Sequence, residues 1–246
     1  MDLVSGEIIC IDKPLGWTSF DAVKRLRGAV QRRLGVRKFK VGHAGTLDPL
    51  ATGVLIVCTG RATKLIEELQ AGDKEYVADL CLGATTPSFD LETQVDATFP
   101  VDHITAEGVE VALASFRGHI MQVPPVFSAV KVDGRRAYKF ARRGQEVELR
   151  AKPLEIKELE TLSFGRDEEG RLTLRIRVVC GKGTYIRALA RDIGNALGSG
   201  AHLTALRRTR VGSYRADSAM TIDQAIEHIS TAVLTFPEGY TQPASN

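Results

Sequence analysis

One acidic side chain lies in a glycine-punctuated stretch whose residue types could do chemistry. The stretch is GHAGTLDPLATG, residues 42–53, and its carboxylate, Asp48, directly precedes Pro49. His43 lies five residues before Asp48, and no other acidic residue occurs in the range 22–66. A residue before proline is biased away from the α region, and glycines permit positive φ angles. The pattern fits a shaped loop that presents one carboxylate, and it equally fits a tight turn with a capping aspartate.

A second candidate is Arg187, which lies in the first turn of a helix that Thr184 is expected to cap. A positive charge there opposes the helix dipole. The guanidinium could reach outward to solvent or to a phosphate, or it could be held against a carboxylate such as Asp48. Two charges 4 Å apart attract by about 4 kcal/mol at an effective dielectric constant of 20. Such a pair would lower the pKa of Asp48 and keep it ionised, as a nucleophile must be. The sequence leaves both alternatives open.

Motifs for several other chemistries are absent from the sequence. The four cysteines are widely spaced without a CxxC pair, and the five histidines show no HExxH spacing. We therefore expect buried free thiols and no metal site. There is no GxxxxGK[ST] or GxGxxG phosphate loop and no GxSxG elbow, and no second acid near Asp48 suggests a glycosidase. This pattern indicates covalent or acid–base catalysis on a charged substrate, without a cofactor.

Basic side chains gather in three stretches, although the net charge is only +3. Residues 22–47 carry eight lysines and arginines with no acid before Asp48. Further basic clusters occupy residues 131–150 and 207–215. Such clusters commonly form a solvated face, but three of them in one chain favour an anionic polymer as the partner.

Length and hydropathy place the chain among ordinary globular proteins. Its 246 residues, of which 43% are hydrophobic, can bury a substantial core. The best apolar run, residues 54–58, is far shorter than the roughly 20 residues of a membrane span. The N-terminus has early acids and no basic n-region, so we expect no signal peptide and a cytoplasmic protein.

The elements that must position these residues are strands and helices without strict βαβ alternation. Alternating or continuous apolar runs predict strands at residues 7–12, 39–42, 54–59, 74–82, 118–123, 127–132, 156–164 and 172–180. Helical spacing predicts helices at residues 63–69, 105–116, 137–143 and 184–197, and two more behind the capping boxes at Thr18 and Thr221. Residues 85–93 are predicted to be a surface loop, and residues 203–214 a basic, partly extended segment. This order favours an α+β fold with a mixed, largely antiparallel β-sheet.

The chain resembles the TruB family of pseudouridine synthases in six segments that occur in family order. They are IDKPLGWTSFD, VGHAGTLDPLATGVL, KEYVADLCLG, QVPPVFSAVKVDGRRAYKFARRG, CGKGTYIRALARDIG and LRRTRVG. One departure is Ala44, where many relatives carry threonine. The resemblance implies a pseudouridine-synthase fold, with a central mixed, largely antiparallel sheet flanked by helices. It also implies an isomerase that converts uridine 55 in the T-loop of tRNA to pseudouridine without a cofactor or a metal.

The resemblance implies three catalytic residues. Asp48 matches the nucleophile, and Arg187 matches the arginine that pairs with it. Tyr76 matches the tyrosine that stacks on the target base and assists proton transfer, although it could also be a core aromatic on a strand. Whether the carboxylate attacks C1′, attacks C6 or leads through a glycal intermediate stays open.

The resemblance further implies four RNA-binding residues. His43 matches the residue that inserts into the T-loop when the target uridine flips out. Tyr185 and Leu206 match residues that line the pocket for the uracil. Lys13, with the basic helix of residues 24–40, is expected to contact phosphates.

The resemblance implies one catalytic domain at residues 1–234 and a flexible tail at residues 235–246. Typical relatives continue into a small C-terminal PUA-type domain, for which too few residues follow here. We therefore expect a short-form monomer that acts on the T-arm stem-loop of tRNA, with no obligate protein partner and no membrane association. Three rival interpretations are a non-catalytic RNA-folding factor, a guide-RNA-dependent synthase, and an unrelated hydrolase that uses Asp48.

Overall fold

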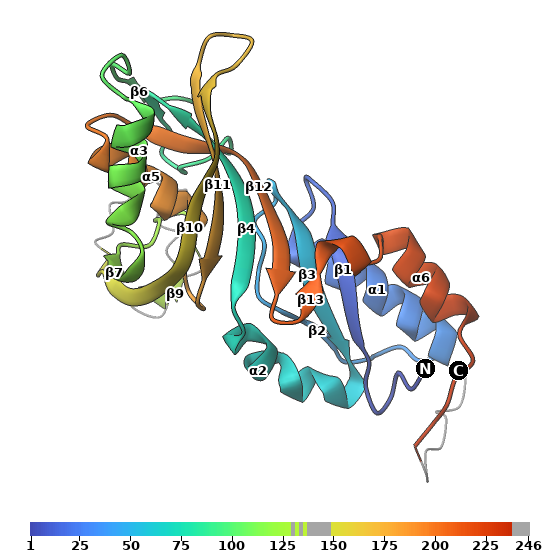
Figure 1. Cartoon of the computed structure of the whole chain (residues 1–246). Helices are drawn as coiled ribbons and strands as arrows, with labels where there is room; N and C mark the ends of the chain where they lie inside the picture. Colours follow the sequence, from blue (N-terminus) through green and yellow to red (C-terminus); the bar gives the residue numbers. More distant parts are fainter. Residues whose placement is uncertain (129–130, 133–134, 137–148, 238–246) are drawn as a thin grey trace. The chain divides into compact units, whose positions relative to one another are not determined.

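The computed structural model describes residues 1–128, 131–132, 135–136 and 149–237 (Figure 1). The chain divides into two compact units: unit 1 is formed by Met1–Lys74 and Arg207–Asn246, and unit 2 by Glu75–Leu206. The predicted turn at residues 133–134, the predicted helix at 137–143 and most of the predicted tail lie outside the described residues. Within the described part, every helix is too short or too polar to span a bilayer.

Unit 1 contains antiparallel strands around a continuous apolar strand. This strand, β3 (Ala51–Thr59), pairs with β1 (Ile8–Lys13) and with β2 (Val41–Ala44). Residues 207–211 of β12 (Ala201–Val211) also belong to unit 1, and Arg210 and Val211 among them pair with β13 (Tyr214–Arg215). The predicted strand at residues 39–42 is thus displaced towards the glycine-rich stretch, and the strand predicted at 54–59 begins three residues earlier.

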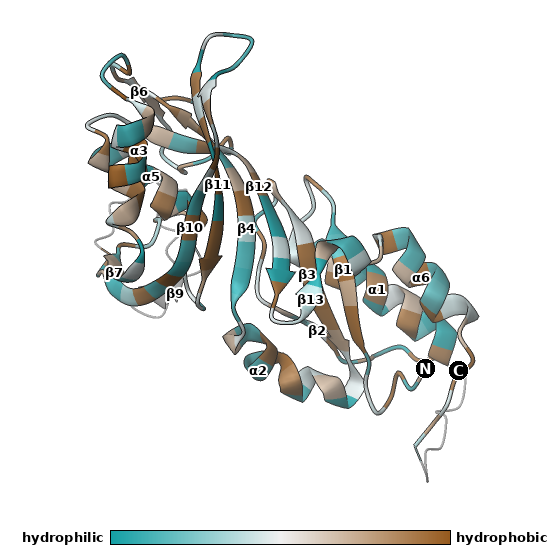
Figure 2. Cartoon of the chain, in the orientation of Figure 1, coloured by the Kyte–Doolittle hydropathy of each residue, from teal (hydrophilic) through white to brown (hydrophobic). Residues whose placement is uncertain are grey.

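Helix α1 (Ser19–Leu34) packs beside α6 (Ile222–Thr231), with which it shares the larger core of unit 1 (Figure 1). Both predicted capping boxes are present, Thr18 with Asp21 and Thr221 with Gln224. Figure 2 shows hydrophobic and hydrophilic residues alternating along α1, whose buried side includes Ala22, Val23, Leu26, Val30 and Leu34. Gly35 ends α1 with a φ of 67°, a conformation that glycine adopts without strain. A 3₁₀ segment (Gly60–Leu65) and α2 (Ile66–Ala71) replace the single helix predicted at 63–69, and a 3₁₀ turn (Ala216–Ser218) follows β13.

Unit 2 is built on longer antiparallel strands. From Glu75 onward, β4 (Lys74–Leu82) belongs to it, followed in the sheet by β11 (Leu172–Cys180), β10 (Lys152–Arg166) and β7 (Gly118–Gln122). The unit also contains two helices, α3 (Ala106–Ala114) and α5 (Ile186–Ala196). Two short strand pairs complete it: β5 (Ala84–Thr85) with β6 (Ala97–Thr98), and β8 (Lys131–Val132) with β9 (Arg135–Arg136). Strands and flanking helices confirm the predicted α+β fold with a largely antiparallel sheet.

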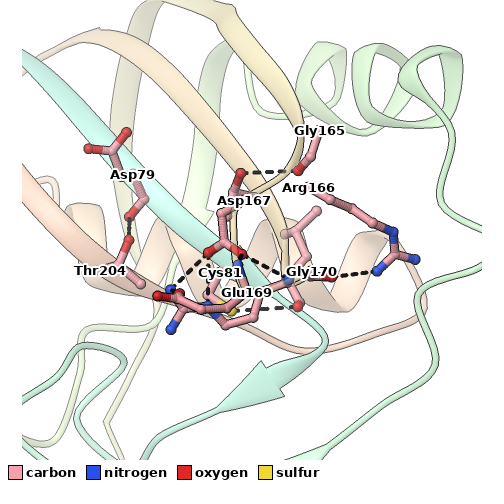
Figure 3. A network of polar contacts seen from close by, with 11 residues as sticks. Asp79, Cys81, Gly165, Arg166, Asp167, Glu169, Gly170 and Thr204 are labelled. Carbon is pink, nitrogen blue, oxygen red and sulfur yellow. Dashed lines mark hydrogen bonds and ion pairs between the residues drawn. The ribbon is translucent and has the colours of Figure 1, made fainter.

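Strands β10 and β11, both predicted, form a hairpin whose turn is held by one carboxylate (Figure 3). Asp167 accepts hydrogen bonds from the backbone N–H groups of Glu169 and Arg171 and from Nε of Arg171, at 2.8 to 3.1 Å. Both strands are paired along the hairpin, so β10 is longer than the predicted 156–164. All four cysteines are free thiols, as expected, although Cys10 is only partly buried.

Candidate active site

The carboxylate singled out by the sequence lies on a short loop of unit 1. Because β2 extends to Ala44 and β3 begins at Ala51, the irregular backbone around Asp48 is only residues 45–50, shorter than the predicted 42–53. Both Gly45 and Gly53 have a positive φ, of 95° and 104°. At Gly53 a Cβ would in addition lie 2.1 Å from the carbonyl oxygen of Arg208. Gly53 therefore permits close approach of another strand of the same protein.

The Asp48 loop is held through its backbone by a buried arginine of β12. Arg208 is 1% exposed, and its Nε donates to the carbonyl oxygen of Val54 at 2.8 Å. Its two terminal nitrogens donate to the carbonyl oxygens of Gly45, at 3.2 Å, and Thr46, at 3.4 Å. A planar guanidinium can hold several acceptors in fixed directions at once. Arg208 thus ties the loop that carries Asp48 to the neighbouring strands, a role that sequence reasoning missed.

A second clamp acts on the residue immediately before Asp48. The Oγ of Ser19 accepts from the N–H of Leu47 at 2.8 Å and donates to its carbonyl oxygen at 3.1 Å. The carbonyl oxygen of Asp48 itself accepts from the N–H of Ala51 at 3.1 Å. None of these bonds uses the carboxylate of Asp48. They leave that group for other interactions while they restrict the direction of the main chain.

Lys13 is fully buried and faces the same loop. Its Nζ donates to the carbonyl oxygens of Pro14 at 2.9 Å, Trp17 at 2.6 Å and Pro49 at 3.5 Å. A buried ammonium needs such acceptors because its desolvation is costly. In this arrangement Lys13 stabilises the loop after Asp48, and its predicted contact with phosphates stays a prediction.

The buried lysine should change how stability depends on pH. Burial lowers the pKa of Lys13 to about 8, from an ordinary value of 10.5, with Asp48 as the largest opposing influence. Between these two values the unfolded chain binds more protons than the folded one, so rising pH stabilises the fold. Each unit of pKa difference corresponds to about 1.4 kcal/mol, which limits the gain to about 3 kcal/mol. The gain is measured as the difference in the free energy of unfolding between wild type and Lys13→Met, by urea unfolding at about pH 7 and about pH 10. A difference that is the same at both pH values would contradict this expectation.

His43 lies on β2, opposite Val57 of β3. Burial is the largest cause of a lowered pKa at His43, and Arg208 lowers it further. The imidazole is therefore neutral near pH 7. Its Nδ1 is buried without a hydrogen-bond partner among the described residues. A neutral ring can stack on a base, and the predicted insertion of His43 into the RNA stays a prediction.

In unit 2, Arg187 does not reach outward but is 4% exposed at the start of α5. Its terminal nitrogens donate to the carbonyl oxygens of Ser88 at 3.0 Å and Phe127 at 2.8 Å. Its Nε lies 3.6 Å from Oδ2 of Asp90, whose side chain is also buried. The guanidinium is thus oriented from three sides, and its predicted pairing with Asp48 stays a prediction.

The predicted surface loop at residues 85–93 is only partly exposed. Residues 86–93 form a loop in which Pro87, Leu91 and Glu92 are exposed. Thr86, Ser88 and Asp90 are at most 5% exposed. The polar side chains that suggested solvent exposure are hydrogen-bonded inside the unit: the hydroxyl groups of Thr86 and Ser88 both donate to the carbonyl oxygen of Asp90. Buried polar groups are normally paired in this way. Asp90 is the carboxylate that sequence reasoning missed, because its partner Arg187 lies far away in the sequence.

Tyr185 is positioned by a buried amide. It is the N-cap residue of α5, so the prediction that Thr184 caps this helix is wrong, and the hydroxyl of Thr184 donates instead to the carbonyl oxygen of Gly181. Gln122 is 1% exposed, and its Oε1 accepts from the N–H of Tyr185 at 2.9 Å while its Nε2 donates to the carbonyl oxygen at 3.2 Å. These bonds fix the backbone two residues before Arg187.

The predicted site residues fall into two groups that belong to different units. Unit 1 carries Asp48, His43 and Lys13, around one loop. Unit 2 carries Tyr185 and Arg187 on one helical turn, Tyr76 on β4 with 8% exposure, and the half-buried Leu206 on β12. Chemically, unit 1 offers a carboxylate with an immobilised backbone, and unit 2 offers a buried, oriented guanidinium. These are groups that nucleophilic catalysis by a carboxylate requires.

Two family models match the chain. The model of the TruB family pseudouridylate synthase N-terminal domain matches residues 31–186, and the model of the tRNA pseudouridylate synthase B C-terminal domain matches residues 187–234. A tRNA pseudouridine synthase B from Phocaeicola vulgatus is 61% identical over 91% of this chain and 93% of its own length. The protein of the same name from Parabacteroides distasonis is 58% identical over 97% of this chain and 99% of its own length.

Two solved chains with a similar fold come from complexes that contain Cbf5 and Nop10. A chain of a Cbf5–Nop10–Gar1 complex is 31% identical, with a TM-score of 0.67 over 93% of this chain. A chain of the archaeal box H/ACA sRNP Nop10–Cbf5 complex is 27% identical, with a TM-score of 0.63 over 92% of this chain. The chain spans about half the length of these solved chains, 55% and 54%. Together with the family models and the relatives of nearly equal length, these likenesses establish that the chain belongs to the TruB family of pseudouridylate synthases.

Proposed function

We propose that this protein converts uridine 55 in the T-loop of tRNA to pseudouridine, with Asp48 as the nucleophile. The observation that carries the proposal is the Asp48 loop, in which one carboxylate sits on a backbone held by Ser19, Lys13 and Arg208. Relatives named tRNA pseudouridine synthase B, 58–61% identical over nine tenths of the chain, support tRNA as the substrate.

The reaction is an isomerisation. The bond between N1 of uracil and C1′ of ribose breaks, the base turns, and C5 forms the new bond to C1′. C5 loses its proton and N1 carries one in the product, so no atoms are gained and no redox partner is needed. Asp48 is proposed to hold the nucleotide as a transient covalent adduct, with Arg187 keeping the carboxylate ionised. The bond between the carboxylate and the nucleotide breaks again as the product forms, which regenerates free Asp48. Tyr76 is proposed to stack on the base and assist the proton transfer.

The target uridine must leave the stack of the T-loop, which costs a few kcal/mol. His43 is proposed to replace part of the lost stacking, and Tyr185 and Leu206 to line the pocket that receives the uracil. Contacts to phosphates offset the rest of the free energy of flipping. Each neutralised phosphate contributes about 0.7–0.9 to the slope of the logarithm of affinity against the logarithm of salt concentration. The basic residues of α1 suit that role.

The proposed substrate is the T-arm stem-loop, and the proposed organisation is one catalytic domain of residues 1–234 that acts as a monomer without an obligate protein partner. With tRNA as the substrate, we expect the protein in the cytoplasm. If the protein were instead a guide-RNA-dependent synthase, it would show no turnover without added guide RNA and partner proteins.

One experiment separates these possibilities. Purified protein is incubated with an unmodified tRNA transcript, with the isolated T-arm stem-loop, and with a transcript in which uridine 55 is cytidine, and pseudouridine is mapped by chemical labelling. We expect modification of both uridine-containing RNAs at similar rates and none of the cytidine control. Pseudouridine at another position, or turnover that depends on an added RNA or protein, would contradict the proposal.

A further inference from the structure

Helix α1 carries an open groove on its solvent side, within unit 1. The groove is a cavity of about 500 Å³ that includes Trp17, Asp21, Lys24, Arg25, Gly28 and Arg32 in its lining. A neighbouring cavity of about 680 Å³ shares Trp17 and Arg25. Trp17 is half-buried, whereas Lys24, Arg25 and Arg32 are exposed. The groove therefore combines an aromatic wall with several cationic groups.

The floor of this groove is a glycine that the helix itself does not require. Gly28 lies in the interior of α1, where glycine lowers helix stability relative to alanine. Its φ lies outside the left-handed region, and a Cβ there would meet only Nη1 of Arg32, at 3.5 Å, which is ordinary contact. Neither backbone conformation nor close packing thus explains Gly28. The missing side chain leaves the groove open.

The cationic groups of the groove are available to a ligand. Among the described residues, Lys24, Arg25 and Arg32 form no ion pair. The carboxylate in the lining, Asp21, is engaged in the capping box, where it accepts from the N–H of Thr18 at 3.0 Å and from its hydroxyl at 2.6 Å. The net character of the groove is positive, so a polyanion is its complementary partner.

The groove lies next to the loop that carries Asp48. The N–H of Gly16 donates to the carbonyl oxygen of Pro49 at 2.8 Å, and Nζ of Lys13 bridges the carbonyl oxygens of Trp17 and Pro49. From this junction the helix between Asp21 and Arg32 extends for roughly 16 Å, at about 1.5 Å per residue. A strand held at Asp48 can therefore continue along α1.

We propose that this groove binds the RNA strand next to the target nucleotide, with one base against the indole of Trp17 and phosphates on Lys24, Arg25 and Arg32. The inference rests on the proposed function, which already assigns phosphate contacts to α1, and adds to it a stacking position at Trp17 and a path for the strand along the groove. Base stacking on an aromatic side chain tolerates any sequence, and arginines bind phosphates through several directed hydrogen bonds. The Asp and Glu side chains of an acidic peptide would satisfy the charges, but they present no flat ring to Trp17.

Trp17 is the only tryptophan of the chain, so its fluorescence reports on this groove directly. The full-length protein is titrated with the T-arm stem-loop, and tryptophan emission is followed beside an independent measurement of binding by filter retention. We expect saturable quenching with the same midpoint as binding. Emission that stays unchanged while the RNA is bound would overturn the proposal.

Two groove variants and one matched control complete the test. Arg32→Glu should weaken binding roughly fivefold or more and lower the salt slope by about 0.7–0.9. Gly28→Gln fills the groove without a change of charge and should also weaken binding, while thermal unfolding confirms that α1 is intact. Arg166→Glu makes the same charge reversal on the exposed β10–β11 hairpin, where Arg166 forms a surface ion pair with Asp102 and donates to the carbonyl oxygen of Gly170. It should bind within about twofold of wild type, because exposed pairs contribute little.

The two proposals fail in different ways. If wild type forms pseudouridine while Arg32→Glu and Gly28→Gln bind like wild type, the groove proposal is overturned and the proposed function stands. If wild type forms no pseudouridine but RNA quenches Trp17 and both groove variants weaken binding, the groove stands and the proposed function is overturned.

Discussion

Replacing Asp48 with asparagine is expected to abolish pseudouridine formation while RNA binding stays largely intact. Asparagine has nearly the same shape but no negative charge, so it cannot attack an electrophilic carbon as a carboxylate does. The bonds that shape the loop, from Ser19 to Leu47 and from Ala51 to the Asp48 carbonyl oxygen, use the backbone and survive the change. The rate at saturating RNA should fall by about 10⁴-fold or more, as for other lost nucleophiles.

The measurement is single-turnover pseudouridine formation, with filter retention for binding. Asp217→Asn is the matched control, because Asp217 is an exposed acid of unit 1 that pairs with Arg215 at the surface. It should keep the wild-type rate. Substantial turnover by Asp48→Asn would mean that the nucleophile is another group.

Replacing Arg187 with alanine is expected to reduce both stability and activity. The change strands the buried carboxylate of Asp90 and removes the donors to the carbonyl oxygens of Ser88 and Phe127. Breaking a buried ion pair by removing one partner costs about 3–5 kcal/mol. Urea unfolding should show a loss of this size, and the rate should fall even at temperatures where the variant is folded.

A second variant separates the structural loss from the catalytic one. Asp90→Asn added to Arg187→Ala neutralises the stranded carboxylate, so it should recover part of the lost stability. It should not recover activity, because the proposed cation near Asp48 is still missing. A double variant that is as active as wild type, or a single Arg187→Ala variant with normal rate and stability, would show that Arg187 is not part of the site.

Elements with local causes were predictable from the sequence. The capping boxes of Thr18 with Asp21 and of Thr221 with Gln224 involve residues three positions apart, and both are present. The alternating patterns of β4 and β11 predicted both strands with the bounds observed. These features depend on hydrogen bonds and periodicity within a few residues, which a linear pattern records.

Elements with distant causes were not predictable in the same way. Residues 85–93 are polar and contain a proline, which is typical of an exposed loop, yet the interior position of Ser88 and Asp90 follows from Arg187, about a hundred residues away. The length of β10 is likewise decided by its pairing with β11 and β7. A composition pattern carries no information about such partners.

Residue types and their spacing were enough to identify the family resemblance, the α+β class and the one carboxylate on which the chemistry is proposed to depend. The folded chain was needed to tell which basic residues face solvent. Lys13 and Arg208 are buried because carbonyl oxygens from distant segments surround them, whereas Arg25 and Arg32 are exposed on α1. Residue types that look alike in the sequence thus separate into groups that hold the Asp48 loop and groups that can bind RNA, because desolvating a cation is tolerable only where acceptors replace water.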